Sequence, residues 1–357
     1  MRATAAVSAL VQAARLPFVM WQEPVRGGYP EWELFGLSGL ELMQSFLKRG
    51  GPAPPISHLM GLRPTVMEYG DVTFTMPATR WLLNPTGYIQ GGVLATLADA
   101  PFGCAVHTAL PPATPYTTSE LSMTFIRPVT EKSGTISARG RLIHVGKSMA
   151  LSEVSVTDGD DRLVAHGTSR CFVFDQMTPV PEPPDTIPPY EPPEYETPDP
   201  YERPAEGETL PPSIWKERDG LGVLRAGIAR ELPAPPVYYL TGMRPVEASE
   251  GAATFVMPAS EWLNSPLARV QGGAIAWLAD SALSCAAQTT VPAGMTYVTL
   301  DLKVNFLRPV TADGTDLTAH GKVVHRGRTL AIANAEVLNA EGKKVAFGTG
   351  TIMLRPA

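Results

Sequence analysis

The sequence predicts two tandem copies of one α+β domain, in each of which an antiparallel sheet wraps a long buried helix. Three observations predict this fold class. The chain repeats itself at a constant offset of 181 residues, with 29 identities among the 67 residues from 39 to 105. A proline-rich segment separates the copies, and in each copy one apolar helical stretch precedes several strand-like runs. A repeat of this length indicates two whole domains and not the short units of a solenoid.

The composition fits two folded domains and excludes some classes of function. The chain has 357 residues, of which 44% are hydrophobic, enough to fill two cores. A formal net charge of -6 argues against binding of nucleic acid, because affinity for phosphate backbones requires concentrated Lys and Arg. Cys104 and Cys285 occupy the same position in the two repeats and Cys171 stands alone, so we interpret all three as reduced thiols. This use of cysteine predicts a cytoplasmic location.

The domain boundaries follow from the repeat and from the proline-rich segment. We expect an N-terminal extension at 1–38, a first domain at 39–174, a linker at 175–213 and a second domain at 214–357. The linker holds thirteen prolines with Glu and Asp between them, which is typical of an extended, semi-rigid strap, with a partner-binding proline motif as the alternative. The stretch from Met1 to Leu16 is too weakly basic for a signal peptide. No apolar run approaches the roughly 18 residues of a membrane span.

Each element of the repeat is placed by its periodicity. Residues 39–48 carry apolar side chains at helical spacing and end near a Gly-Gly pair. The stretch that begins at Gly91 is small and apolar nearly all round, as a buried helix requires. Residues 300–306 alternate between apolar and polar side chains, as a half-buried strand does. The strands expected in the first repeat are 71–76, 118–127, 134–145, 149–157 and 162–174.

One short motif occurs once in each repeat and carries the candidate chemistry. Gln90-Gly91-Gly92 is followed by Asp99, and Gln271-Gly272-Gly273 is followed at the same spacing by Asp280. Two glycines at a helix start allow close approach to the backbone, and their free N–H groups at the positive end of the helix dipole suit a carbonyl oxygen or an oxyanion. The Asp lies in a helix otherwise free of charge, where burial of an unpaired carboxylate is unfavourable. We expect it either to act in chemistry or to bond a neighbouring strand.

These residues resemble a known family. The Gln-Gly-Gly motif, the apolar stretch to Asp, and a later Thr-x-x-Leu-x-x-x-Phe-x-Arg-Pro strand at 118–128 and 299–309 are similar to the hotdog-fold acyl-CoA thioesterases of the phenylacetate-pathway type. The resemblance covers residues 39–174 and 220–355. It implies two tandem hotdog domains paired within one chain, an acyl-CoA substrate, no cofactor beyond the coenzyme A of that substrate, and a homodimer of the two-domain chain as a further assembly.

The resemblance also assigns roles to residues of both repeats. It places each site between the domains, with the glycine from one repeat and the acid from the other. The first site would combine Gly91, Asp280, Asn84 and Thr299, with Gln90 at the turn and Gly92 against the substrate. The second site would combine Gly272, Asp99, Ser265 and Thr118, with Gln271 and Gly273 in the corresponding places.

Three departures from the family pattern predict that the two sites are unequal. Gln90 and Gln271 stand where the family commonly has His, and an amide can orient the turn by hydrogen bonds but cannot titrate. Pro101 lies inside the first glycine-led helix, where proline removes a hydrogen bond and costs about 3 kcal/mol unless the helix kinks. Ser265 replaces an Asn of the family, although a slipped turn would present the adjacent Asn264. The first site is therefore expected to be closer to the family pattern.

The reaction implied by the resemblance is hydrolysis of a thioester. The carbonyl oxygen would accept the N–H of Gly91 or Gly272, and Asp280 or Asp99 would either activate water or attack to form a mixed anhydride. Two turns place a glycine beside cations between strands and suit a phosphate of coenzyme A, although a plain hairpin with solvated charges is the alternative. These residues are Gly146, Lys147, Arg326, Gly327 and Arg328, with Arg127 and Arg308 as lesser candidates.

Two other functions remain open. A non-catalytic acyl-CoA-binding module would tolerate the glutamines and Pro101, whereas an Asp in both repeats argues for catalysis. A hotdog hydratase or dehydratase would need a His beside the carboxylate, and none occurs in the glycine-led helix before His107. No pair of His residues has metal-ligand spacing, and neither a Gly-x-Ser-x-Gly elbow nor a Cys-His arrangement occurs. We therefore expect no metal site.

Overall fold

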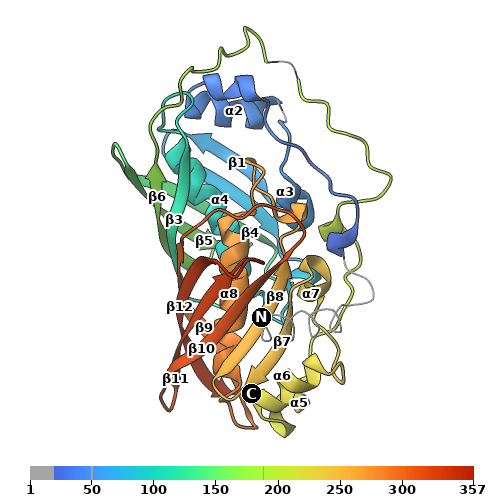
Figure 1. The fold of residues 1–357 in the computed structure, drawn as a ribbon. Helices are drawn as coiled ribbons and strands as arrows, with labels where there is room; N and C mark the ends of the chain where they lie inside the picture. Colours follow the sequence, from blue (N-terminus) through green and yellow to red (C-terminus); the bar gives the residue numbers. More distant parts are fainter. Residues whose placement is uncertain (1–19, 50, 188) are drawn as a thin grey trace.

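The protein folds as a double hotdog in which one curved antiparallel sheet surrounds two central helices (Figure 1). The computed structural model describes residues 20–49, 51–187 and 189–357. Within these residues the sheet has twelve strands in the order β1-β2-β4-β5-β6-β3-β9-β12-β11-β10-β8-β7. The long helices are α4 (Gly91–His107) and α8 (Gly272–Gln288). The predicted fold class is confirmed.

Each half contributes six strands and a set of short helices. The strands of the first half are β1 (Arg63–Glu68), β2 (Asp71–Pro77), β3 (Tyr116–Phe125), β4 (Thr135–Val145), β5 (Met149–Thr157) and β6 (Leu163–Val173). Those of the second are β7 (Arg244–Ser249), β8 (Ala252–Pro258), β9 (Met295–Phe306), β10 (Asp316–Arg326), β11 (Leu330–Leu338) and β12 (Lys344–Pro356). The short helices are α2 (Gly39–Arg49), α3 (Pro55–Met60), α5 (Pro212–Glu217), α6 (Gly220–Ile228) and α7 (Pro236–Thr241).

The strands expected from periodicity occur within two residues of the predicted bounds, but two features differ. The edge strands β1 and β7 and the one-turn helices α3 and α7 were not predicted, because segments of six residues are too short to show a period. The two halves also share one sheet, since β3 pairs with β9 over Glu120–Thr124 and Asn305–Asp301. Among the described residues, no helix is long and apolar enough to cross a bilayer.

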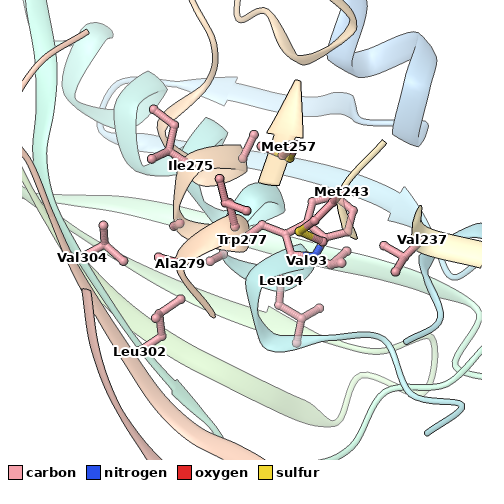
Figure 2. Packing of buried hydrophobic residues seen from close by; sticks show 14 of the residues in the cluster. Val93, Leu94, Val237, Met243, Met257, Ile275, Trp277, Ala279, Leu302 and Val304 are labelled. Carbon is pink, nitrogen blue, oxygen red and sulfur yellow. The ribbon is translucent and has the colours of Figure 1, made fainter. Parts of the chain in front are cut away.

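The two long helices form the centre of a shared core. Trp277 of α8 is fully buried and lies beside Val93 and Leu94 of α4 (Figure 2). Each helix is buried nearly all round because it has sheet on one side and the other helix on the opposite side. Burial of a large apolar side chain is worth roughly 1.5–3 kcal/mol. Separation of the halves would expose this surface, so the central core depends on both halves.

Two extended arms clasp the halves together. The first arm is residues 20–38 and the second, at the end of the linker, is residues 200–219. The amide of Gly28 donates to the Ala53 carbonyl at 3.0 Å, and the amide of Glu208 donates to the Ala234 carbonyl at the same distance. These contacts are related by the repeat, so the segment before residue 39 has a counterpart after all. Sequence identity between the arms is too low to reveal it.

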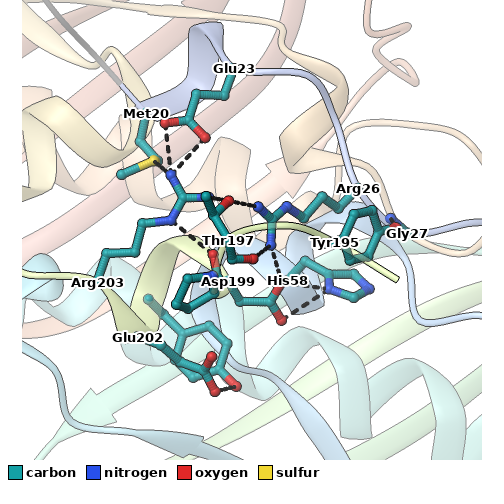
Figure 3. Close-up of polar contacts among 12 residues, drawn as sticks. Met20, Glu23, Arg26, Gly27, His58, Tyr195, Thr197, Asp199, Glu202 and Arg203 are labelled. Atoms are coloured by element: carbon teal, nitrogen blue, oxygen red, sulfur yellow. Dashed lines mark hydrogen bonds and ion pairs between the residues drawn. The ribbon is translucent and has the colours of Figure 1, made fainter. Parts of the chain in front are cut away.

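Each arm also reaches the opposite half, and a polar network joins them (Figure 3). The indole N–H of Trp262 donates to the Glu23 carbonyl at 3.0 Å, and that of Trp81 donates to the Arg203 carbonyl at 2.9 Å. The guanidinium of Arg203 in turn donates to the Glu23 carboxylate at 2.7 Å. The second arm thus anchors the end of the linker to both halves.

A second ion pair of the same network fixes the linker to the first half. Asp199 accepts from Arg26 at 3.3 Å and lies 3.0 Å from the Nδ1 atom of His58 on α3. Burial raises the pKa of Asp199, while His58 and Arg26 lower it, and the net pKa lies below its ordinary value. The interpretation of the linker as a strap fits these contacts.

Candidate active site

The two glycine-led helices run antiparallel, and each helix start meets the Asp of the other helix. The Gly92 amide donates to Oδ2 of Asp280 at 2.8 Å. The Gly273 amide donates to Oδ2 of Asp99 at 2.9 Å. The structure therefore brings the predicted glycines and acids together across the two repeats. The first site is the end with Asp280, and the second site is the end with Asp99.

The second glycine of each pair is required by the close approach of the helices. A Cβ atom on Gly92 would lie 2.5 Å from the Cα atom of Trp277. A Cβ atom on Gly273 would lie 2.5 Å from the Cα atom of Thr96. Any larger residue would push the helices apart and break the amide-to-carboxylate hydrogen bonds.

Both candidate threonines bond the acid of their own repeat. The Thr299 hydroxyl donates to Oδ1 of Asp280 at 3.1 Å, and the Thr118 hydroxyl donates to Oδ1 of Asp99 at 3.2 Å. Each carboxylate is thereby held at both oxygens, one by a helix N-terminus and one by the first part of a strand. The resemblance placed each threonine in a site with an Asp, and the structure shows the hydrogen bond that joins Thr299 to Asp280 and Thr118 to Asp99.

Burial dominates the electrostatics of both acids. Asp280 has no exposed surface, and burial raises its pKa to about 6 against the opposing hydrogen bonds from Gly92 and Thr299. Burial likewise raises the pKa of Asp99, which is 7% exposed, against Gly273 and Thr118. A carboxylate with a pKa near 6 is ionised at neutral pH yet basic enough to accept a proton.

The two glutamines are held differently. Gln90 donates to the Ser281 hydroxyl at 2.9 Å and accepts from the Trp277 indole at 3.3 Å. Gln271 donates to the Thr96 carbonyl at 3.3 Å, and its buried amide oxygen has no partner among the described residues. Gln90 is thus fixed at both ends of its amide and orients the turn at the first site.

A cavity of about 190 Å³ opens at the first site. Gln90, Gly91 and Thr299 lie on its wall, together with Ser281, the residue that follows Asp280. Aromatic side chains form much of the remaining wall: Tyr88, Phe125, Tyr238, Phe255 and Tyr297. Asp280 itself lies behind Thr299.

Asn84 lies at the first site, where its side-chain oxygen is held by its own loop. Oδ1 of Asn84 accepts from the backbone N–H of Thr86 at 2.9 Å and from that of Tyr88 at 3.3 Å. Asn84 lies on the cavity wall, where it caps the loop that leads to Gly91. In the second site the expected slipped turn does not occur, because Asn264 is buried and its amide donates to the hydroxyl of Tyr29 in the first arm at 2.8 Å.

The cationic turns lie at the ends of two hairpins, away from the cavity wall. Residues 146–147 join β4 to β5, and residues 327–329 join β10 to β11. Arg326 donates from Nε to the Thr290 hydroxyl at 3.0 Å. Arg127 lines the cavity and donates to a backbone carbonyl, whereas Arg308, its counterpart, donates to the Lys344 carbonyl at 2.5 Å.

Sequence reasoning missed two cavity residues that have no twin in the repeat. Arg355 and Tyr88 both line the cavity, but the corresponding positions hold Phe174 and Arg269. Pro101 lies inside α4, which continues to His107 as one α-helix. Neither residue of the cavity pair belongs to a recognisable motif, so no sequence signal pointed to it.

The fold and the paired helix sites define a double hotdog protein. The thioesterase superfamily model matches the chain twice, at residues 86–165 and 269–346, and each match contains one glycine pair with its Asp. The chain thus carries two tandem matches to the thioesterase superfamily domain, one in each repeat.

Known proteins agree with this family. The chain is 26% identical over 120 residues to a 1,4-dihydroxy-2-naphthoyl-CoA hydrolase of Listeria monocytogenes, an alignment that covers 32% of this chain and 94% of that one. Its fold is similar to the acyl-CoA thioesterase II of Mycobacterium marinum, with a TM-score of 0.51, 13% identity, and coverage of 85% of this chain and 97% of that chain. The tesB protein of Mycobacterium avium subsp. paratuberculosis gives a TM-score of 0.51 and 15% identity, with coverage of 85% of this chain and 98% of that chain. These identities establish the shared fold alone.

Proposed function

We propose that the protein hydrolyses the thioester bond of an acyl-CoA, principally at the first site. The observation that carries this proposal is the position of Gly91 at a helix N-terminus on the cavity wall, next to Gly92, whose amide bonds the buried carboxylate of Asp280. Among the described residues no acceptor takes the Gly91 amide hydrogen, which is one of the unpaired donors of the helix start. The two matches to the thioesterase superfamily domain and the hydrolase named among the relatives support the same reaction.

The substrate carbonyl oxygen accepts the Gly91 N–H, which stabilises the negative charge that develops there. Asp280 removes a proton from water as the water oxygen bonds to the carbonyl carbon. The carbon–sulfur bond then breaks and the thiolate of coenzyme A leaves. The proton on Asp280 is transferred to this thiolate. Direct attack by Asp280 to form a mixed anhydride, followed by hydrolysis, gives the same products. Thr299 holds the carboxylate in either route.

The first site is proposed as the stronger of the two because it combines the cavity with a fully held Gln90. At the second site Ala100 replaces Ser281 at the equivalent position, and the amide oxygen of Gln271 is left without a partner among the described residues. The hairpin cations at 146–147 and 326–328 remain proposed contacts for the phosphates of coenzyme A.

The second candidate function is a non-catalytic acyl-CoA-binding module. One observation favours it: Asp280 has no exposed surface, and both of its oxygens already accept hydrogen bonds. In this reading the two acids clamp the helices together and the cavity holds a thioester without cleaving it. A hydratase is disfavoured because no His lies on the described cavity wall.

The test is release of coenzyme A from short, medium, long-chain and aryl acyl-CoAs. Asp280→Asn is expected to lower kcat by about 10²–10⁴, the range for loss of a general base. Asp99→Asn is the matched variant in the same motif and is expected to retain most of the activity. Turnover of every thioester at the rate of a sample without protein would reject hydrolysis in favour of the binding module. Equal losses in both variants would reject the inequality of the sites.

We also propose a reducing, cytoplasmic location, which the free thiols of all three cysteines support. The domain bounds given above, and a homodimer of the two-domain chain, remain proposals. Size-exclusion chromatography with light scattering tests the second of these.

A further inference from the structure

The cavity at the first site passes through an opening in the sheet. The pairing of β3 with β9 ends at Thr124 and Asp301, so residues 297–300 of β9 have no strand partner on that side among the described residues. The loop segments 84–90 and 125–129 lie across this gap and line the cavity. The cavity wall thus includes residues from both faces of the sheet.

Strand alternation separates the two ends of the cavity. Tyr297 faces α8, because its hydroxyl lies 3.7 Å from Sγ of Cys285, and Leu354 is directly opposite Tyr297 in the ladder. Successive residues of a strand point to opposite faces. Arg355, opposite Thr296, therefore lies on the outer face of the sheet, at the mouth of the cavity.

Arg355 is braced by an aromatic ring and keeps an unused donor. Its guanidinium carbon lies 5.6 Å from the centre of the Tyr88 ring, and Nη2 donates to the Tyr88 hydroxyl at 3.3 Å. Stacking on an aromatic ring holds the planar guanidinium in one orientation. The Nε atom of Arg355 is buried and has no hydrogen-bond partner among the described residues.

The charge around Arg355 suits an anion. The described cavity wall contains two cations, Arg355 and Arg127, and no carboxylate. The Leu354 amide also donates to the Thr329 carbonyl at 2.8 Å, which places the hairpin that carries Arg328 beside the mouth. An anionic oxygen that binds Arg355 would therefore contact no carboxylate of the cavity wall.

Size selects which part of the substrate lies at the mouth. Sites that enclose cofactor-sized ligands have volumes of ~300–1,000 Å³, so about 190 Å³ accommodates an acyl group but not coenzyme A. Resting on the proposed function, we infer that Arg355, braced by Tyr88, binds a phosphate of the coenzyme A moiety outside the cavity and makes the first site selective for coenzyme A thioesters.

Comparison of the two repeats shows that the pair of Arg355 and Tyr88 occurs at the first site alone. The strand position of Arg355 is taken by Phe174 and the loop position of Tyr88 by Arg269, so cation and aromatic are exchanged. Among the described residues no cation–π contact joins that second pair, and Phe174 instead packs edge-to-face against Phe172. Each chain is expected to bind one coenzyme A tightly.

Calorimetric titration of the full chain with coenzyme A and with pantetheine, which lacks the phosphates, tests the inference without requiring turnover. Arg355→Gln is expected to weaken coenzyme A binding by about 10–100-fold, as for loss of a charge-assisted hydrogen bond, and to leave pantetheine binding unchanged. Arg355→Lys keeps the charge but loses the fork and the stacking, so an intermediate loss is expected. Arg269→Gln, the matched control at the other site, is expected to bind coenzyme A like the native chain.

The inference is overturned if Arg355→Gln binds coenzyme A normally, if it weakens pantetheine equally, or if Arg269→Gln shows the same loss. Should Arg355→Gln fail to fold, the Lys variant decides by the same comparison of the two ligands. If Arg355→Gln loses coenzyme A affinity but the native chain hydrolyses no thioester, the phosphate-binding role of Arg355 is supported and the proposed hydrolysis is rejected. If the native chain hydrolyses thioesters and Arg355→Gln binds coenzyme A with unchanged affinity, the proposed hydrolysis is supported and the role of Arg355 is rejected.

Discussion

Replacement of Asp280 by Asn should make the protein more stable above pH 6 while abolishing turnover. Burial raises the pKa of Asp280 from its ordinary value of 3.8 to about 6. At about 1.4 kcal/mol per pKa unit, this rise corresponds to about 3 kcal/mol of native-state destabilisation when the carboxylate is ionised. The protonated Asp280 side chain therefore contributes stability that is fully present below pH 4, and this stability is lost as pH rises through about 6.

The substitution removes the charge without removing the hydrogen bonds. The Asn carbonyl oxygen can accept from Gly92, and the Asn amide can donate to Thr299, because a hydroxyl serves as donor or acceptor. The variant should therefore match the native chain near pH 4 and exceed it by up to about 3 kcal/mol at pH 8. In the native enzyme, kcat/KM should rise with pH through about 6 as the free carboxylate forms.

Denaturant unfolding of both proteins at pH steps between 4 and 8 measures this difference. A constant gap between the two curves across that range would show that Asp280 titrates at its ordinary pKa, and the proposed base would lose its electrostatic support. Asp99→Asn gives a second reading in the same direction, since burial raises that pKa as well.

Two further predictions concern packing and surface charge. Gly92→Ala should destabilise the protein by about 1–3 kcal/mol through overpacking against Trp277, whereas Gly227→Ala in α6, where a Cβ meets nothing within 4 Å, should stabilise it slightly; similar melting temperatures for both variants would contradict the close helix approach. The hydrogen bond from Arg139 holds the pKa of Asp71 below its ordinary value of 3.8, so Asp71→Asn should lower stability at pH 7, and the deficit should shrink progressively as pH falls below 3.8. A deficit that is as large at pH 3 as at pH 7 in the same unfolding assay would rule out the ion pair as its cause.

The sequence predicted the fold because it depends on patterns that repeat, whereas the pairing of glycine and Asp across the repeats was predicted by the family resemblance that these patterns support. The glycine pair, the Asp eight residues beyond the first glycine, and the alternating strands each occur twice, and a helix buried all round requires sheet on every free side. Geometry that depends on non-repeated contacts was out of reach. The hydrogen bonds that hold the side-chain oxygen of Asn84 to its own loop, for example, have no pattern in the sequence.

The residues at the cavity mouth could not be predicted from the sequence either. Arg355 and Tyr88 are 267 residues apart in sequence, and neither has a twin at the repeat offset. Their contact depends on where the pairing of β3 with β9 stops, which no local pattern encodes. The counterpart of the first arm was missed for a related reason, since the two arms share backbone contacts but few side chains.

The crossed arms bear on how such a chain came to have unlike sites. In a symmetric assembly of two single-domain subunits, one gene encodes both glycine-led helices, so any change at one site appears at the other. Here the second arm continues directly from the linker. The contacts between each arm and the opposite half, which would join two subunits in such an assembly, therefore lie within one polypeptide. Each half is thereby free to mutate alone while the clasp keeps the halves at a fixed ratio. The exchange of arginine and aromatic residues between the two mouths is the kind of divergence that such a fusion permits.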